Sequence, residues 1–305
     1  MTSHRGLKIG VVGAGVMGKN HARVLASLPG IKLVGVADVD ALRAEEIGKL
    51  YKTDFFSDYH DLLPLVDAVC LSTPTKTHFD LAFSFISAKK HIFIEKPFTG
   101  SSATAKELIA HAKENGVVLQ VGLIEHFNPA FTKLKKLIEG EKILGVDIKR
   151  LSPFPERITD TDVVFDMMLH DLDLLLNLVP EEISGLHAKG EKIRSKMLDR
   201  VIATFNHVNG VVARIEASRV FSTKTRKIAV TTDRSFFDAD LIEKKIYIRD
   251  FSSPTPSTVP VKANDQITDE FKNFLSSIKN NSQPLVSGHS ALAAIILAEE
   301  VLKAC

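Results

Sequence analysis

Short, almost continuously apolar runs alternate with longer helical stretches over the first 125 residues. The runs predict strands at residues 8–12, 31–37, 68–72, 91–94 and 117–121. The stretches between them predict helices at residues 18–28, 41–50, 77–88 and 104–115. Strands that are apolar on both faces are typical of a parallel sheet covered by helices on both sides. The alternation therefore predicts a doubly wound α/β domain at residues 1–125.

The pattern changes after residue 125. Two helical stretches, at residues 131–139 and 163–178, are followed by consecutive strand-like runs. These predicted strands are residues 183–190, 200–207, 211–218, 227–232, 236–242 and 245–249. The dipeptide Asn209-Gly210 between two of them is a strong hairpin signal, so we expect an antiparallel sheet. A loop at 252–260 and helices at 265–279 and 287–303 complete an expected α+β domain over residues 126–305.

Composition and charge narrow the function classes. The 305 residues are 45% hydrophobic and 25% charged, which is ordinary for a soluble globular protein of two domains. A formal net charge of +2 favours neither nucleic acid nor an anionic membrane surface as a partner. No apolar run is long enough to span a membrane. Cys70 and Cys305 are the only cysteines, so we expect no structural disulfide and a cytoplasmic location.

A glycine-rich turn follows the first predicted strand. Gly13-Ala14-Gly15-Val16-Met17-Gly18 has the spacing with which a strand–turn–helix unit binds a dinucleotide. Gly13 allows the tight turn, Gly15 lets the backbone approach a pyrophosphate, and Gly18 lets helix and strand pack closely. The phosphates would lie on the free N–H groups of the helix start. Asp38 ends the next strand and would bind the adenosine ribose, so NAD is predicted rather than NADP.

A lysine follows the fourth predicted strand, in the triplet Glu95-Lys96-Pro97. The carboxyl ends of parallel strands form the edge where ligands bind in open α/β sheets. Pro97 would stiffen the loop because its φ is fixed. We therefore expect Lys96 near the reactive end of the dinucleotide; a solvated surface lysine is the alternative.

An acidic and a basic residue interrupt the apolar helix predicted at 163–178. Asp166 and His170 are spaced to share one face of a helix, and a buried polar pair is costly without a partner. Imidazole titrates near neutrality, so His170 suits proton transfer. A self-satisfied core pair is the alternative, and we predict no metal site because a third ligand at suitable spacing is missing. Asp171 and Asp173 are expected to be exposed or to cap contacts.

Other polar residues lie at the predicted strand ends. Ser72, Thr73 and Pro74 end the third main strand and are expected to line the pyrophosphate and nicotinamide side, with His78 either joining them or merely starting a helix. Candidates for substrate contact are Glu125, His126, Asn128 and Arg157. His21, in the first helix, is expected to pack rather than react.

These residues together resemble the Gfo/Idh/MocA family of NAD(P)-dependent oxidoreductases. The resemblance rests on the glycine motif, the Ser72-Thr73-Pro74 strand end with His78, the Glu95-Lys96-Pro97 triplet, and the spacing of Asp166 and His170. It implies a Rossmann domain followed by an open-faced antiparallel sheet, through which such proteins form dimers or tetramers. It also implies that Glu95 contacts the nicotinamide ribose, that Lys96 and His170 are the acid/base pair, and that Asp166 orients the substrate or the lysine.

Three further segments, at residues 17–23, 122–129 and 163–173, resemble the nucleotide-sugar enzymes of this family, such as UDP-N-acetylglucosamine 3-dehydrogenases. The resemblance implies hydride transfer between a sugar C3 hydroxyl and NAD, with Lys96 or His170 as the base. His126 departs from it, because arginine is common at this position.

Three alternatives stay open: a dehydrogenase of a free sugar or of a polyol such as an inositol, an NAD-dependent lyase or hydrolase with a transient redox cycle, and a non-enzymatic cofactor-binding regulator.

Overall fold

A computed structural model describes residues 6–155 and 161–305, and these residues separate into two compact units. The first unit contains the described residues up to Ile124 together with Ile267–Leu292. The second contains the described residues of Glu125–Gln266 together with Ala293–Cys305. The division into domains at residue 125 stays a prediction, and the units add that Ile267–Leu292 packs with the N-terminal part of the chain.

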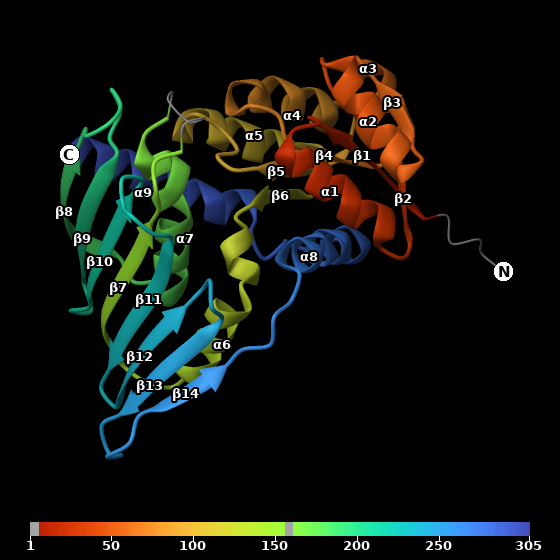
Figure 1. Cartoon of the computed structure of the whole chain (residues 1–305). Helices are drawn as coiled ribbons and strands as arrows, with labels where there is room; N and C mark the ends of the chain where they lie inside the picture. The colour runs from red at the N-terminus through yellow and green to blue at the C-terminus, as the bar shows by residue number, and fades with distance from the viewer. Residues whose placement is uncertain (1–5, 156–160) are drawn as a thin grey trace. The chain divides into compact units, whose positions relative to one another are not determined.

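A parallel sheet forms the centre of the first unit (Figure 1). Within the described residues, its six strands lie in the order β3-β2-β1-β4-β5-β6, which confirms the predicted doubly wound topology. The strands are β1 (Leu7–Val12), β2 (Ile31–Ala37), β3 (Asp54–Phe56), β4 (Ala68–Leu71), β5 (His91–Glu95) and β6 (Leu119–Gly122). The short edge strand β3 lies outside the predicted strands because its residues are exposed or half-buried and form no apolar run.

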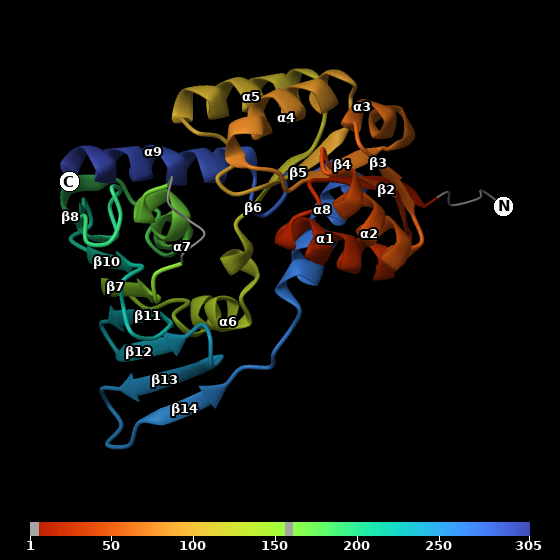
Figure 2. The ribbon, with the colours of Figure 1, turned by 45° about the horizontal axis from the view of Figure 1, so that its top comes forward.

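Helices cover both faces of this sheet (Figure 2). One face carries α1 (Val16–Ser27), α2 (Ala41–Tyr51) and α8 (Gln266–Asn280), and the other carries α3 (Tyr59–Leu62), α4 (His78–Ser87) and α5 (Ser102–Glu114). Phe271 and Phe274 of α8 belong to the same buried hydrophobic cluster as Ile9 and Val11 of β1. Their ring centroids lie 4.7 and 5.9 Å from that of Phe93 in β5. Helix α8 thus supplies part of the core beneath the first sheet.

The second unit is built on a larger mixed sheet. Within the described residues, its eight strands lie in the order β14-β13-β12-β11-β7-β10-β9-β8. They are β7 (Ile143–Leu151), β8 (Ile183–Glu191), β9 (Arg200–His207), β10 (Val212–Ser218), β11 (Thr225–Thr232), β12 (Ser235–Asp240), β13 (Lys245–Asp250) and β14 (Ser257–Pro260). Most neighbours are antiparallel, as predicted, whereas β7 and β10 run parallel, so the sheet is mixed. The prediction of a loop over residues 252–260 was wrong at Ser257–Pro260, which form β14.

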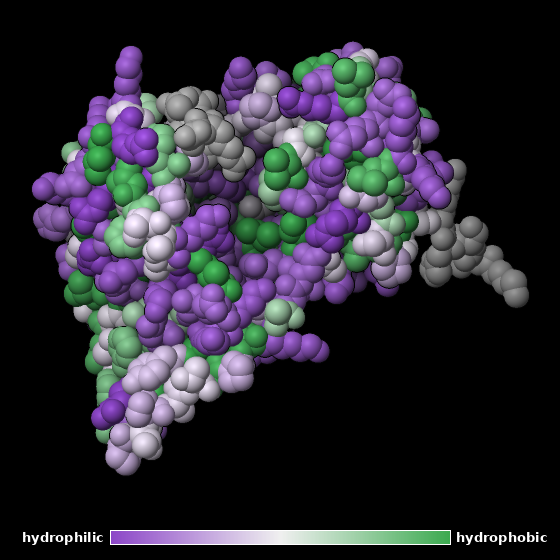
Figure 3. Space-filling model, in the orientation of Figure 1, coloured by the Kyte–Doolittle hydropathy of each residue, from purple (hydrophilic) through white to green (hydrophobic). Residues whose placement is uncertain are grey.

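Helices α6 (Pro129–Leu137), α7 (Leu169–Leu178) and the end of α9 (Gly288–Ala304) lie on one face of this sheet (Figure 1). Buried and half-buried residues alternate along β9, as a sheet with one covered face requires. The half-buried positions carry a ladder of ion pairs in which Arg214 bridges Glu216 at 2.8 Å and Asp147 at 3.1 Å. Hydrophilic and hydrophobic side chains are intermixed in the surface view of Figure 3. None of the helices among the described residues is long and apolar enough to cross a membrane.

Candidate functional site

The glycine motif lies at the carboxyl end of β1, where each glycine has a distinct steric reason. Gly13 has φ of +99°, and a Cβ there would lie 2.7 Å from the Ser72 backbone. A Cβ on Gly18 would overlap the carbonyl oxygen of Gly13. Gly15 caps the start of α1, and apart from Gly15 and its two chain neighbours no atom of the described residues lies within 4 Å of where its Cβ would be. The space over Gly15, next to exposed Val16 and half-buried Met17, therefore fits the approach of a ligand.

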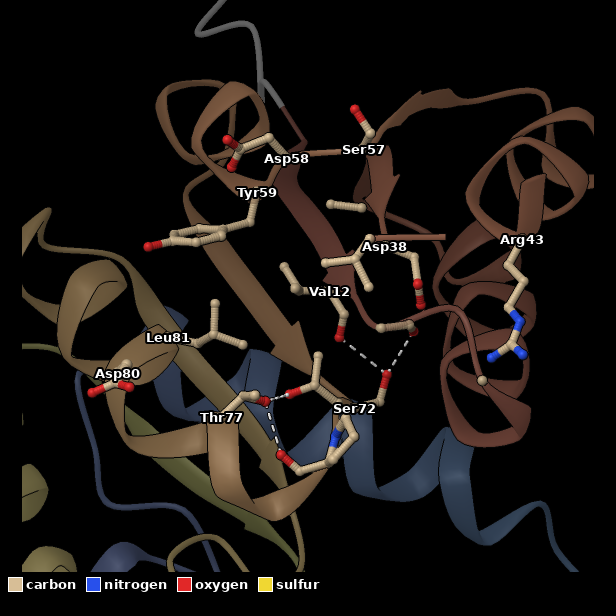
Figure 4. Close-up of a pocket in the computed structure, with 16 residues that line it drawn as sticks. Val12, Asp38, Arg43, Ser57, Asp58, Tyr59, Ser72, Thr77, Asp80 and Leu81 are labelled. Atoms are coloured by element: carbon tan, nitrogen blue, oxygen red, sulfur yellow. Dashed lines mark hydrogen bonds between the residues drawn. The ribbon is translucent and has the colours of Figure 1, made fainter. Parts of the chain in front are cut away.

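A cavity of about 790 Å³ opens beside this turn (Figure 4). It is lined by residues from five segments of the first unit, including Gly13, Asp38, Tyr59, Ser72 and Thr77. Asp38 Oδ2 accepts from the Ala14 N–H at 2.6 Å, and Oδ1 accepts from the Asp40 N–H at 2.8 Å. The carboxylate thus ties the end of β2 to the glycine turn while it faces the cavity.

Arg43 also lines the cavity, although it lies within α2. Its Nε is 3.0 Å from Oδ2 of Asp40, which caps the same helix. This pairing places an acidic group beside the guanidinium.

The ends of β4 and β5 are joined by a buried histidine. His78 is 1% exposed, with Nε2 at 2.8 Å from the Thr73 carbonyl oxygen and Nδ1 at 3.0 Å from that of Pro97. Burial lowers the pKa of His78, and a neutral ring donates to one of these two carbonyls at a time. His78 therefore links the Ser72-Thr73-Pro74 strand end, which lines the cavity, to the Glu95-Lys96-Pro97 turn.

Glu95 ends β5 and is followed by half-buried Lys96. One carboxylate oxygen of Glu95 lies 3.0 Å from Nε2 of His21, and the other accepts from the Lys96 N–H at 3.2 Å. Lys96 thus follows the carboxyl end of β5 in the first unit, and its place beside a cofactor stays a prediction.

Asp166 and His170 lie in the second unit. Asp166 comes just before α7, and His170 lies within it. Asp166 falls in a π-helical turn, Val164–Met168, and His170 in the first turn of α7. Both side chains are half-buried. Asp162 begins the segment by accepting from the N–H groups of Val164 and Phe165 at 2.8 and 3.0 Å. A π-turn interrupts the regular helix at this candidate residue, and such turns are frequent at functional sites.

The residues expected to contact substrate are mostly buried. Glu125, His126 and Asn128 are 2%, 5% and 2% exposed. Glu125 Oε1 accepts from Arg150 at 2.9 Å and from Arg226 at 3.1 Å, and its Oε2 accepts from Asn128 at 3.0 Å. These contacts make the segment part of the framework of the second unit. Arg157 lies outside the described residues.

Asp171 and Asp173 are buried, at 1% and 2% exposure, so the expectation that they are exposed was wrong. Asp171 accepts from Arg150 Nη2 at 2.8 Å, and Asp173 lies 2.7 Å from His126 Nε2. Although burial opposes the charge, Asp171 and Glu125 raise the pKa of the Arg150 guanidinium above its ordinary value. The partners of Asp171 and Asp173 are distant from them in the sequence, so no local sequence pattern predicts the two contacts.

Comparisons with known proteins match both parts of the chain. Residues 7–123 match an oxidoreductase family with an NAD-binding Rossmann fold, and residues 146–236 match the GFO/IDH/MocA C-terminal domain. The chain is 32% identical over 301 residues to UDP-N-acetylglucosamine 3-dehydrogenase from Acidithiobacillus ferrooxidans, with 95% of each chain covered. A solved structure of that enzyme aligns with a TM-score of 0.93 at 31% identity, over 98% of this chain and 97% of that one. The scyllo-inositol 2-dehydrogenase (NAD(+)) of Bacillus subtilis is 27% identical over 92% of this chain and 89% of its own.

The matches agree with the fold described above. They extend over both compact units rather than over the nucleotide-binding part alone. The chain therefore belongs to the GFO/IDH/MocA family of oxidoreductases, and its N-terminal part is an NAD-binding Rossmann domain.

Proposed function

We propose that this oxidoreductase transfers a hydride between a secondary alcohol of a sugar and NAD, and that the sugar is a UDP-N-acetylhexosamine oxidised at C3. The observation that carries the substrate is the 32% identity to a UDP-N-acetylglucosamine 3-dehydrogenase over 95% of each chain. Inositol dehydrogenases are also relatives, at 26–27% identity for two that align over most of this chain. A nucleotide sugar is therefore the first substrate to test, and an inositol the second.

The residues of the first unit fit NAD. The N–H groups at the start of α1 would hold the pyrophosphate, because Gly15 leaves open space there. Asp38 would accept from the adenosine ribose within the cavity of about 790 Å³. Ser72, Thr73, Pro74 and His78 would border the path from the pyrophosphate towards Glu95 and Lys96. When bound, NAD accepts the hydride.

Proton transfer falls to side chains of this chain. The hydroxyl proton must leave as the C–H bond gives up its hydride, so a base within hydrogen-bond reach is required. We propose that Lys96 and His170 form the acid/base pair and that Asp166 orients the substrate or the lysine. Lys96 acts as a base where burial or a neighbouring positive charge lowers its pKa, whereas imidazole needs no such change.

A single-turnover experiment tests this function. Protein saturated with NAD is mixed with UDP-N-acetylglucosamine, and NADH absorbance is followed; myo-inositol and scyllo-inositol are run in parallel. We expect NADH to form with the nucleotide sugar. NADH formed only with an inositol would contradict the proposed substrate and favour the polyol alternative. Product formed from a sugar without any net NADH would favour the redox-cycling alternative, and NADH binding without any reaction would favour a regulator.

Asp38 sets the predicted preference for NAD. Asp38→Asn keeps one acceptor oxygen but removes the charge that repels a 2′-phosphate, so we expect the NAD-over-NADP ratio of kcat/KM to fall about 10–100-fold, as for a lost hydrogen bond to a charged group. Steady-state kinetics with both cofactors measure the ratio. Asp80→Asn is the matched control, because Asp80 lines the same cavity and is exposed. An equal fall in both variants would assign the effect to general charge.

Two further proposals concern the second unit and the cell. The ion-pair ladder around Arg214 occupies the half-buried positions of the mixed sheet, and we propose that this face joins copies of the chain into a dimer or tetramer. A cytoplasmic location stays a prediction. Glu125, His126 and Asn128 stay candidates for substrate contact, with their buried bonds showing that each also supports the framework.

A further inference from the structure

We propose that His21, which a buried hydrogen bond joins to Cys70, holds the carboxylate of Glu95 through a close polar contact, and that His21 is thereby a positioning residue for the nicotinamide half of the cofactor. The inference rests on the proposed role of Glu95 at the cofactor. It assigns a function to a residue of α1 that the sequence interpretation left to packing.

The sheet order places Glu95 on the correct side of the cofactor site. A dinucleotide crosses a doubly wound sheet where the strand order reverses, which here is between β1 and β4. The cavity at Asp38 lies by β1 and β2, so the adenosine half belongs there. The other half would then extend over the ends of β4, β5 and β6, where Glu95 ends β5 opposite Gly122 of β6.

The contacts form a chain of three side chains. His21 is 0% exposed; its Nδ1 lies 2.9 Å from Cys70 Sγ and its Nε2 lies 3.0 Å from Glu95 Oε1. Cys70 is also fully buried, whereas the Glu95 side chain keeps 13% exposure. The chain therefore runs from the core of the first unit to its surface and ends on the carboxylate.

One arrangement of protons in a neutral histidine fits both of its contacts. An ionised carboxylate only accepts, so the arrangement has a proton on the Nε2 of His21 that approaches Glu95. In this structure the 3.0 Å approach is a polar contact without the geometry of a hydrogen bond, and Nε2 has no hydrogen-bond partner among the described residues. Nδ1 is then an acceptor, and the Cys70 thiol donates to it. Burial, reinforced by Glu95 and Glu270, raises the pKa of that thiol well above its ordinary value, so the S–H proton stays in place. A thiol that donates to Nδ1 therefore favours the tautomer with its N–H on the side of Glu95.

The surroundings leave little freedom to either end of the contact. Phe93 and Phe271 stand edge-on to the His21 ring, with centroids at 5.4 and 5.2 Å. A Cβ on Gly122 would lie only 3.2 Å from Glu95 Oε2. Buried Glu270 would compete for the histidine as a second anion, but burial and the charge of Glu95 raise its pKa well above the ordinary value. Glu270 is therefore held towards its neutral form and competes less with Glu95 for the histidine.

A double-mutant cycle tests the inference, with NADH affinity measured by fluorescence titration. His21→Leu removes the polar contact to Glu95, and we expect the Kd for NADH to rise about tenfold, since 1.4 kcal/mol corresponds to a factor of ten. His21→Gln keeps an N–H in reach of Glu95 and should stay within about threefold of the parent. In the Glu95→Gln background, His21→Leu should change the Kd less than about twofold, because the carboxylate it positions is gone.

Thermal unfolding of each variant separates positioning from packing. An equal rise in Kd from His21→Leu in both backgrounds would overturn the inference and leave His21 a core residue. An unchanged Kd in Glu95→Gln alone would overturn the role of Glu95 and the inference with it. Neither result depends on a substrate, so failure of the proposed nucleotide-sugar activity is seen separately, in the single-turnover experiment.

The thiol end of the chain has its own matched pair. Cys70→Ser keeps a donor to Nδ1, whereas Cys70→Ala removes it at similar size. We expect the Kd for NADH to rise about threefold in Cys70→Ala relative to Cys70→Ser, as for one modest hydrogen bond. Equal affinities in the two variants would remove Cys70 from the proposed chain.

Discussion

Replacing Lys96 with methionine is expected to lower the turnover number about 10²–10⁴-fold, the usual contribution of a positioned acid or base. Lys96 follows Glu95 at the carboxyl end of β5, on the edge of the sheet where ligands bind. Methionine keeps the length and much of the volume of the side chain but has no proton to accept or donate. NADH affinity should change far less than turnover, because Glu95 and the glycine turn remain.

Lys76→Met is the matched control for this change. Lys76 is an exposed lysine in the short turn Thr75–Thr77 that follows β4. Its replacement changes the net charge of the first unit by the same amount as the replacement of Lys96. We expect its turnover to match the parent within about twofold, as for surface substitutions of small effect. The dependence of kcat/KM on pH is measured for His170→Gln and for Lys96→Met. The variant whose profile loses the titration identifies the base. Unchanged turnover in Lys96→Met would remove the lysine from the mechanism.

Replacing Arg150 with methionine is expected to destabilise the second unit by about 3–5 kcal/mol, as when one partner of a buried ion pair is removed. Arg150 is 4% exposed, and its guanidinium lies 2.9 Å from Glu125 and 2.8 Å from Asp171. Methionine fills much of the space but leaves buried Asp171 without its cation, while Glu125 keeps Arg226 at 3.1 Å. Asp171 must then take up a proton to remain inside, so the stability of the variant should fall further as pH rises.

Arg200→Met supplies the comparison. Arg200 also joins two carboxylates, Glu191 and Glu216, but its side chain is 34% exposed. Water replaces its partners there, and we expect a loss of about 1 kcal/mol or less. Thermal and denaturant unfolding of both variants measure the difference. Equal losses would mean that burial of the Arg150 cluster does not govern its contribution.

The parallel sheet could be predicted because its strands are short apolar runs separated by clear helices. The edge strand β3 and the strand β7 carry weaker signals. Residues Ile143–Leu151 alternate well enough to bury Val146 and Ile148, but Asp147, Lys149 and Arg150 interrupt the run. A search for period-two alternation over this segment would have found the strand.

The candidate site likewise has one part that local sequence features predict and one part that depends on distant partners. Glycine spacing and a strand-end lysine are local features, and the structure places them at one edge of one sheet. Burial of Glu125, Asp171 and Asp173 depends on Arg150 and His126, which the fold brings from elsewhere in the chain. Charged residues are mostly exposed, so a sequence predicts exposure for each of them unless its partner is known. The burial of these three carboxylates could therefore be found only from the structure.

The return of the chain to its first unit sets an order for folding during synthesis. A ribosome that has delivered all six parallel strands has not yet delivered Phe271 and Phe274, which belong to the hydrophobic cluster under those strands. The whole of the mixed sheet is made in between. The nascent Rossmann domain must therefore wait with part of its apolar surface uncovered, and a chain cut before Ile267 keeps that surface open permanently.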